Sequence, residues 1–389
     1  MHILTVRSTL PDMGPGTQPL VIARELRSRG DTVSFATSGG AYTDTVRAAD
    51  FPVHIIPELA PDRHRLGAVV RAVAALRRLI VAENPDVIHG HNAAATILAV
   101  TAARLAGKRI PAVTSVRGVE ERDTHQWRNK IWKRTPGVLL AVCEKTRDRL
   151  LSFGVPDDRI SVTYNGVDLA RFQPESVDGA VQRQALGLTG KIVVGTTGAF
   201  TGSPAQGGPS KGQHILVKAV AQLKDRHPDL AVLLVGDGKT RSMVEDLARD
   251  LGCADRVVFA GRRFDVPEML SAMDIYCLAS ISGEFFPNSI IEAMSMGLPW
   301  VGSDIAGLSE LTADGEAGQV TPIGDVAALA ANLDRLAGDA DLRASRGARA
   351  RNEVEQRLSI EHVCDRIVSA YLQAGVPENI ARETSPHVI

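Results

Sequence analysis

The sequence predicts an α/β protein made of two Rossmann-like domains that face each other across a deep cleft. Three observations predict this fold: the chain length, an alternation of strand and helix patterns, and a turn-rich segment that separates two such alternations. At 389 residues the chain exceeds what one hydrophobic core usually supports. Short apolar runs that alternate with amphipathic stretches are typical of a parallel sheet covered by helices on both faces.

The first half contains short apolar runs that we interpret as strands. They lie at residues 3–6, 32–36, 53–56, 87–89, 112–116, 137–142 and 160–163. Amphipathic stretches separate them. In the stretch 66–82, apolar residues recur at helical spacing while Arg71, Arg77 and Arg78 point outward.

The second half repeats this scheme. Strands are expected at 191–196, 230–235, 257–259, 275–278 and 300–302, and helices at 213–226, 240–251, 266–272, 289–296 and 327–336. Turn-forming residues at 164–168 place the domain boundary between the two patterns. We therefore expect one domain over 1–167, a second over 168–372, and a tail over 373–389 that could return to the first. Open α/β sheets bind ligands at the carboxyl ends of their strands, which here would line the cleft.

Composition and charge narrow the class of protein. With 44% hydrophobic and 23% charged residues the composition is that of a globular protein, and no run approaches the roughly 18–20 apolar residues that span a bilayer. The first residues read as a strand rather than a signal peptide, and the four cysteines are far apart and have no metal-binding spacing. We expect a cytoplasmic protein with reduced thiols.

Positive charge is concentrated in the first half. Residues 1–167 hold 23 Lys and Arg against 16 Asp and Glu, whereas the remainder holds 21 against 29. A basic N-terminal domain could meet an anionic acceptor or contact a membrane surface peripherally, although scattered surface charge explains the same counts. The basic, aromatic stretch 127–134 could likewise contact an anionic acceptor or lipid headgroups, and an ordinary surface helix is the alternative.

Two segments could bind phosphate. Gly14 and Gly16 lie between the first strand and the first helix, where glycines let the backbone approach a ligand and a helix start favours an anion. A tight turn without a ligand explains this segment equally well. The spacing matches neither the dinucleotide fingerprint nor a Walker A loop.

The segment 283–292 carries a stronger signal. Pro287 precedes a predicted helix that begins at Asn288 and Ser289, so unpaired backbone amides would face a phosphate. Glu284 lies before this helix and Glu292 within it. Carboxylates accept hydrogen bonds from sugar hydroxyls, so the pair suits a ligand with phosphate in the middle and hydroxyl groups at both ends. An ordinary helix start with a surface glutamate is the alternative.

These residues resemble the retaining glycosyltransferases of family 4, which have the GT-B fold. Glu284 and Glu292 reproduce the family's motif of two glutamates separated by seven residues, and 283–299 is close to its usual wording. Further matches, in the family's order, cover nearly the whole chain: Asn-Gly-Val-Asp at 165–168, Gly-Asp-Gly at 236–238 with Arg241, Val-Val-Phe-Ala-Gly at 257–261, and Ala-Gly-Leu-Ser-Glu at 306–310.

The resemblance implies a role for each matched residue. Glu284 would contact hydroxyls of the donor sugar and Glu292 the ribose of the nucleotide. The amides of Asn288 and Ser289 would hold the diphosphate with help from Lys211. The remaining contacts would come from 259–264, which includes Arg263 and would line the base, and from the loop of Gly14 and Gly16. Domain closure would exclude water.

Two positions depart from the family pattern. Ala199 stands where an arginine that pairs with the diphosphate is usual, and Arg117 stands where many members place a histidine. We hypothesise that Arg117 replaces part of the missing positive charge on the leaving phosphate. A strand-end arginine in solvent is the alternative.

No metal is expected. His89 and His91 end one strand with side chains on the same face, but no third ligand is within reach in the sequence. GT-B enzymes need no divalent ion to bind the donor. Because the family places a His-x-His near the cleft, His91 is a candidate for the site.

The sequence thus predicts transfer of a sugar from a nucleoside diphosphate sugar, most commonly a uridine one, to an acceptor hydroxyl with retention. The acceptor could be a glycan, a glycolipid or a small molecule of cell-envelope or natural-product assembly, and no nucleic acid is expected. The alternatives are a nucleotide-sugar epimerase on the same fold, a nicotinamide-dependent oxidoreductase, which the absent fingerprint disfavours, and a non-catalytic nucleotide-sugar-binding homologue.

Overall fold

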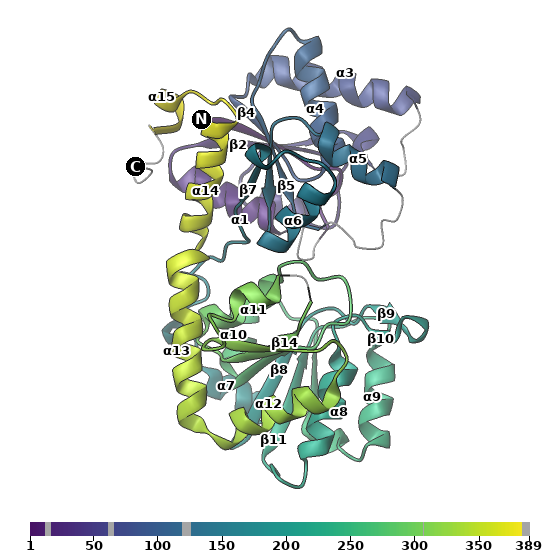
Figure 1. Ribbon diagram of the computed structural model, residues 1–389, viewed down its shortest axis with the longest axis vertical. Helices are drawn as coiled ribbons and strands as arrows, with labels where there is room; N and C mark the ends of the chain where they lie inside the picture. Colours follow the sequence, from purple (N-terminus) through teal and green to yellow (C-terminus); the bar gives the residue numbers. More distant parts are fainter. Residues whose placement is uncertain (12–16, 61–65, 119–125, 306, 383–389) are drawn as a thin grey trace. The chain divides into compact units, whose positions relative to one another are not determined.

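The computed structural model describes residues 1–11, 17–60, 66–118, 126–305 and 307–382. Contacts divide the chain into two compact units (Figure 1). Unit 1 contains Met1–Gly166 and the segment from Ile360 onward, and unit 2 contains Val167–Ser359. Unit 2 therefore ends before α14 (Ile360–Gln373), whereas the sequence-based division kept residues up to 372 in the C-terminal domain.

The apolar face of α14 explains this difference. Val363, Ile367 and Tyr371 are buried in one hydrophobic cluster with Ile22 and Leu26 of α1 (Gln18–Ser28). Removing these side chains from water favours the position of α14 in unit 1 over a solvated helix.

Unit 1 is built on a parallel sheet with strand order β3-β2-β1-β4-β5-β6-β7. Its strands are β1 (His2–Val6), β2 (Thr32–Thr37), β3 (Val53–Ile55), β4 (Val87–Gly90), β5 (Ala112–Val116), β6 (Val138–Ala141) and β7 (Ile160–Val162). Its other helices are α2 (Thr43–Ala48), α3 (Leu66–Glu83), α4 (Ala93–Leu105), α5 (Gln126–Arg134), α6 (Glu144–Ser152) and α15 (Glu378–Arg382). Side chains of β1 alternate between two clusters, with Ile3 packed near α1 and α14 and Leu4 and Val6 near α3 and α4.

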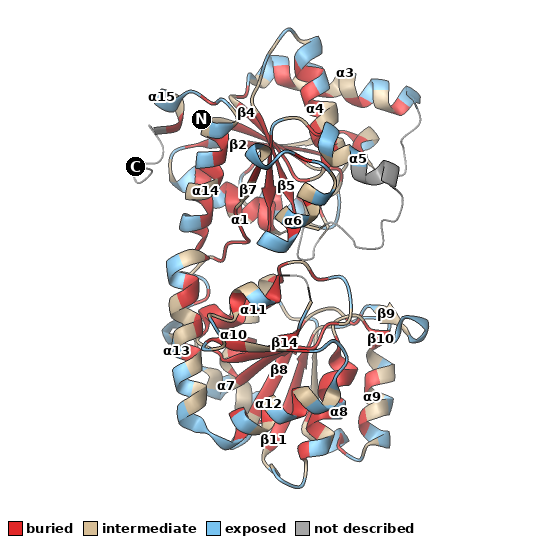
Figure 2. Ribbon diagram, viewed as in Figure 1, coloured by how far each residue is buried: buried red, intermediate tan, exposed pale blue. Residues whose placement is uncertain are grey.

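Unit 2 has a second parallel sheet with strand order β12-β11-β8-β13-β14-β15. Its strands are β8 (Ile192–Thr197), β11 (Leu230–Val235), β12 (Val257–Gly261), β13 (Ile275–Leu278), β14 (Trp300–Ser303) and β15 (Gly318–Thr321). Its helices are α7 (Gly179–Ala185), α8 (Gln213–Leu223), α9 (Arg241–Asp250), α10 (Val266–Ser271), α11 (Asn288–Ser295), α12 (Val326–Gly338) and α13 (Ala340–Arg357). The central strands of each sheet are buried beneath helices (Figure 2). The predicted fold class of two parallel α/β sheets is confirmed.

The structure adds two features of unit 2 that the sequence patterns do not predict. Strand β15 is short and partly polar, and it forms the edge of the sheet beside β14. A small antiparallel hairpin, β9 (Gly202–Ser203) with β10 (Gly208–Pro209), occupies the Gly/Pro-rich stretch before Lys211.

Gly212, which directly precedes α8, allows a close approach of two backbone segments. Its φ is +70°, and an added Cβ would lie 1.7 Å from the carbonyl oxygen of Ala279. We expect Gly212→Ala to lower the free energy of unfolding by about 3 kcal/mol, because a left-handed backbone penalty adds to a backbone clash. Urea unfolding curves would measure this change.

Gly207→Ala is the matched control. Gly207 also has a positive φ, +87°, but the nearest atom to an added Cβ is Ile281 Cδ1 at 3.5 Å. This variant should lose only about 1 kcal/mol. Equal losses in the two variants would contradict the steric explanation.

Candidate functional site

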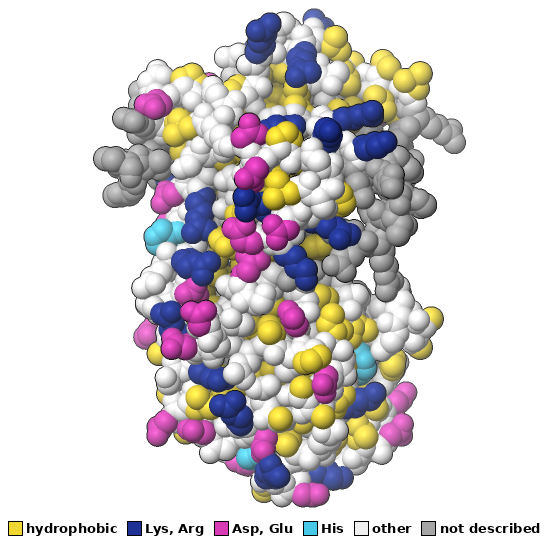
Figure 3. Space-filling view, in the orientation of Figure 1, with side chains coloured by type: hydrophobic (Ala, Val, Ile, Leu, Met, Phe, Trp, Pro, Cys, Tyr) yellow, Lys and Arg dark blue, Asp and Glu magenta, His cyan; other side chains and the backbone are white. Residues whose placement is uncertain are grey.

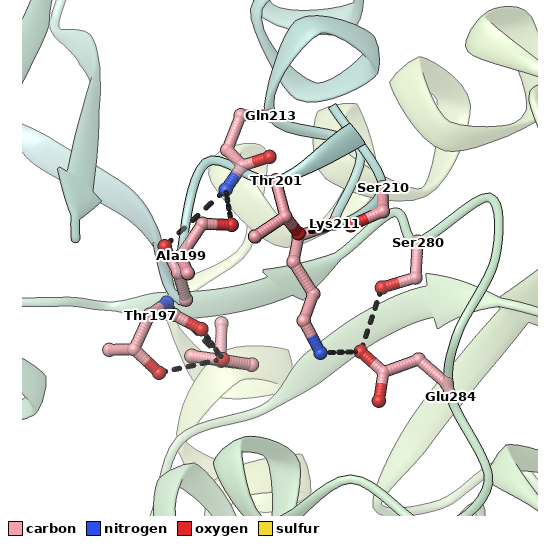
Figure 4. A network of polar contacts seen from close by, with 10 residues as sticks. Thr197, Ala199, Thr201, Ser210, Lys211, Gln213, Ser280 and Glu284 are labelled. Atoms are coloured by element: carbon pink, nitrogen blue, oxygen red, sulfur yellow. Dashed lines mark hydrogen bonds and ion pairs between the residues drawn. The ribbon is translucent and has the colours of Figure 1, made fainter. Parts of the chain in front are cut away.

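A polar site lies in unit 2 at the carboxyl ends of the central strands. Lys211 lies directly before Gly212 and α8, and Glu284 lies in the loop between β13 and α11. The parallel sheet brings these loops to the same edge, and the structure joins the two side chains in an ion pair between Lys211 Nζ and Glu284 Oε1 (Figure 4). Two residues that the sequence assigns to one ligand therefore lie together.

The ion pair is buried on the carboxylate side. The Glu284 side chain is 6% exposed, whereas that of Lys211 is 27% exposed. Ser280 Oγ donates to the same Glu284 oxygen at 3.1 Å (Figure 4). These hydrogen bonds compensate the cost of burying the carboxylate charge. Lys211 keeps its exposed face for a second anion.

The start of α11 offers hydrogen-bond donors next to Glu284 in the chain. Pro287 caps the helix without a side-chain hydrogen bond, so the first backbone amides have no capping acceptor from it. Asn288 and Ser289 are the first two helical residues. Asn288 Oδ1 is buried with no partner in the described part of the chain. A helix start with such open groups favours an anion or a polyhydroxyl ligand.

Tyr276 links this helix to the sheet, although its role was missed by the sequence analysis. Its hydroxyl lies 3.0 Å from Thr197 Oγ1, at the carboxyl end of β8, and accepts from the Thr197 amide at 3.3 Å. Burial raises the pKa of Tyr276 to about 12, while hydrogen bonds from Ser289 and Thr197 act in the opposite direction. The neutral phenol therefore fixes Ser289 against the end of the sheet.

Glu292 lies one turn into α11, and the pKa of its carboxyl is higher than usual. Desolvation raises the pKa of its carboxyl to about 7, although the nearby charge of Arg171 lowers it. A half-buried carboxylate with only one opposing charge is a good acceptor for ligand hydroxyls, since few protein groups compete for it. Arg171, in the segment after the unit boundary, was not identified from the sequence because no motif marks it.

The loop after β8 lacks the arginine that its family position usually holds. Ala199 presents its backbone carbonyl to Gln213 Nε2 at 3.4 Å (Figure 4). Gly236 packs against this loop so closely that a Cβ there would lie 2.1 Å from the Gly198 carbonyl oxygen. Thr201 Oγ1 and Ser210 Oγ, 2.6 Å apart, close the base of the hairpin that precedes Lys211.

Arg263 lies beyond the end of β12. It forms an ion pair with Asp265, with Nε donating to Oδ1 at 2.8 Å, and this bond lowers the pKa of the Asp265 carboxyl. The guanidinium is thus held by its own loop. The neighbouring Phe264 is 77% exposed, and the Arg262 guanidinium carbon lies over its ring, 5.2 Å from the centroid. The other face of the ring could stack on a planar ligand.

Unit 1 brings His89, His91 and Arg117 together at the carboxyl ends of its central strands. The two imidazole rings stack with centroids 4.4 Å apart, which confirms that both side chains share one face. Arg117 Nη1 donates to Asn165 Oδ1. Burial lowers the pKa of His89 to about 3 and that of His91 well below its usual value, so both rings are neutral at pH 7. Gly14 and Gly16 lie outside the described residues.

Neither unit groups three or more His, Cys, Asp or Glu side chains in an arrangement able to hold a metal ion within its described part. No helix in the described ranges has the length and apolar character needed to cross a membrane.

Comparisons with known proteins agree with this fold. Residues 14–171 match the family described as Glycosyltransferase Family 4, and residues 195–339 match Glycosyl transferases group 1. The chain is 25% identical to the N-acetyl-alpha-D-glucosaminyl L-malate synthase of Bacillus anthracis, over 92% of this chain and 93% of that protein.

Two further proteins are similar over most of the chain. The UDP-Gal:alpha-D-GlcNAc-diphosphoundecaprenol alpha-1,3-galactosyltransferase of Escherichia coli is 27% identical, over 79% of this chain and 80% of that protein. The crystal structure of Anabaena Alr3699/HepE in complex with UDP-glucose shares the fold with a TM-score of 0.78 and 24% identity, over 95% of this chain and 98% of that chain. This chain belongs to the group 1, family 4 glycosyltransferases and has their GT-B fold.

Proposed function

We propose that this glycosyltransferase takes its sugar from a UDP-sugar and transfers it to an acceptor hydroxyl with retention of the anomeric configuration. The observation that carries this proposal is the Lys211–Glu284 pair beside the start of α11. It combines a cation and free amides for a diphosphate with a carboxylate for sugar hydroxyls. A relative named for UDP-Gal and a fold neighbour in complex with UDP-glucose support uridine as the base.

Donor binding would rearrange the ion pair. The diphosphate competes with Glu284 for Lys211, and it offers the ammonium two negative charges in place of one. Glu284 is then left with Ser280 and can accept hydrogen bonds from the donor sugar. At the other end, Glu292 accepts from the ribose, and the base lies along 259–264, where Phe264 is exposed and Arg263 forms part of the wall.

The chemistry then depends on stabilising the leaving diphosphate. The bond from the anomeric carbon to the phosphate oxygen breaks, and a bond from that carbon to the acceptor oxygen forms on the same face. The acceptor proton passes to an oxygen of the departing phosphate. Lys211 and the amides of Asn288 and Ser289 would stabilise the negative charge that grows on the diphosphate.

Unit 1 would supply the acceptor side. The face of unit 1 seen in Figure 3 carries Lys and Arg side chains, with exposed hydrophobic side chains and several Asp and Glu side chains among them. Leu66, Val70 and Leu105 are among its exposed apolar residues. Such a mixture suits contact with anionic lipid headgroups, so we propose an acceptor of cell-envelope glycan or glycolipid assembly and peripheral contact with the cytoplasmic face of the membrane.

A thermal-shift panel of nucleotide sugars tests the donor assignment. A bound ligand at 100 times its Kd stabilises the folded protein by about 2.7 kcal/mol, so the correct UDP-sugar should raise the Tm by several degrees. Glu292→Ala should abolish this shift, whereas Glu175→Ala, which removes an exposed carboxylate of unit 2, should preserve it. A shift of equal size in Glu292→Ala would show that the nucleotide binds elsewhere.

A further inference from the structure

Three basic side chains meet in unit 1 beyond the ends of adjacent strands. Arg7 follows β1, His91 follows β4 and Arg117 follows β5, and these strands are neighbours in the order β1-β4-β5. The backbone amide of His91 donates to the Val6 carbonyl at 2.9 Å, which places His91 beside Arg7. The edge involved is the one at which parallel α/β sheets bind ligands.

The hydrogen-bond partners of the two arginines are neutral. Arg7 Nε donates to the backbone carbonyl of Thr9 at 2.7 Å, and Arg117 Nη1 donates to the side-chain carbonyl of Asn165. Arg117 Nε is buried and has no partner within the described ranges. Among the described residues, no carboxylate forms an ion pair with Arg7 or Arg117. Within the part of the chain that the structure describes, the charges of the two guanidinium groups are therefore uncompensated.

His91 adds an open polar atom to the same place. The residue is 5% exposed, and its Nδ1 is buried without a partner in the described part of the chain. The neighbouring His89 is fully engaged, with Nδ1 2.8 Å from the Tyr371 hydroxyl and Nε2 2.9 Å from Ser115 Oγ. His89 therefore supports the stack, and His91 is the member left to bind something else.

In the protein without a bound anion, Arg7 and Arg117 are desolvated, and their like charges repel each other. Burial lowers the pKa of Arg117 to about 9, and the charge of Arg7 adds to that effect. Burial also lowers the pKa of Arg7 to about 10. In addition, α4 begins nearby, with Asn92 as its cap, and the positive end of its dipole has the same sign. Two desolvated like charges next to a helix start are costly unless an anion offsets them.

We propose that Arg7, His91 and Arg117 form a subsite for an oxyanion group, a carboxylate or a phosphate, that the acceptor carries. This inference rests on the proposed transferase function and adds that the acceptor is anionic. Arg117 and Arg7 would bind the oxygens through charge-assisted hydrogen bonds, and the imidazole of His91 would donate a further one in its Nδ1–H tautomer. Open guanidinium donors suit a planar or tetrahedral oxyanion better than a neutral hydroxyl.

The test measures anion binding while the donor site is filled. The full-length protein is saturated with UDP, and its Tm is followed against inorganic phosphate, and then against phenyl phosphate and benzoate. Phosphate should raise the Tm of the wild type, and Arg117→Gln or Arg7→Gln should lose at least two thirds of that shift. Arg117→Lys, which keeps the charge, should retain part of it. Comparison of the two aromatic probes identifies the preferred oxyanion.

Arg104→Gln is the matched control. Arg104 also belongs to unit 1, but it lines a separate cavity of about 790 Å³ beside the start of β5. Loss of the phosphate shift in this variant, or an undiminished shift in Arg117→Gln and Arg7→Gln, would overturn the proposal.

The affinity for UDP shows whether Arg117 binds an anionic group of the acceptor or the diphosphate of the donor. It should change less than twofold in Arg117→Gln. A tenfold weaker affinity would instead assign Arg117 to the donor diphosphate and leave the transferase function intact. Failure of the wild type to bind any nucleotide would count against the proposed function itself.

Discussion

Replacing Lys211 by methionine is expected to lower the rate of sugar transfer by about 10²- to 10³-fold, the usual effect of removing one donor to a developing oxyanion. Methionine keeps the length and apolar body of the side chain but removes the ammonium. The start of α11 would still bind the diphosphate, so the loss should fall more on kcat than on KM. Steady-state kinetics with the donor identified by the thermal-shift panel would measure both constants.

Lys218→Met is the control, because Lys218 lies on the exposed face of α8, seven residues further along the chain. It should retain the wild-type rate. Lys211→Met also leaves Glu284 buried with only Ser280 as its described side-chain partner, so its Tm should be measured alongside the rate. Wild-type turnover in a folded Lys211→Met variant would refute the role of Lys211 at the leaving group.

The affinity for UDP-glucose or its preferred relative is expected to rise about tenfold between pH 6 and pH 8. The pKa of Glu292 is raised to about 7 by desolvation, so most of the carboxyl is protonated at pH 6 and ionised at pH 8. The ionised form is the better acceptor of ribose hydroxyls. Binding therefore favours deprotonation, and the apparent affinity falls as pH decreases through 7. Calorimetric titrations at several pH values would measure this dependence.

Glu292→Gln separates this effect from others. A glutamine keeps a carbonyl acceptor but does not titrate, so its affinity should be lower at pH 8 and almost independent of pH. The stability of the protein without ligand should change in the opposite direction, falling as pH rises through 7. A carboxyl with a raised pKa contributes stability below its unfolded value, near 4.5, and this contribution is lost as pH rises through 7. A pH profile of equal slope in both proteins would assign the dependence to another group.

Except for β15, the strands of the two parallel sheets could be predicted from the sequence because each is a short apolar run between turn residues. Strand β11, whose residues are all buried, is a typical case. Strand β15 was missed because Gly318 and Gln319 weaken its apolar pattern, and its position beside β14 depends on tertiary pairing. The place of α14 in unit 1 was missed for a related reason: periodicity reveals an apolar face but not the surface that covers it.

The donor side of the site could also be predicted only in part, because motifs identify single residues but not the contacts between them. The family resemblance pointed to Lys211 and Glu284, and the structure brings them together, but their mutual pairing follows from loop geometry alone. Tyr276 lies within a buried strand and gives no sign in the sequence that its hydroxyl reaches Thr197. The charge of Arg171 affects the pKa of Glu292, and the charge of Arg7 affects the pKa of Arg117. Sequence spacing does not reveal that the members of each pair lie close together.

The assignment of α14 to unit 1 has a consequence for biosynthesis. Unit 1 begins at the first residue, yet one layer of its core is supplied by residues that a ribosome adds after the whole of unit 2. The face of α1 that carries Ile22 and Leu26 is therefore not yet covered by α14 while the intervening chain is synthesised. Unit 2, which is continuous in sequence, can complete its fold before unit 1 even though it is synthesised second, and α14 then completes the core of unit 1.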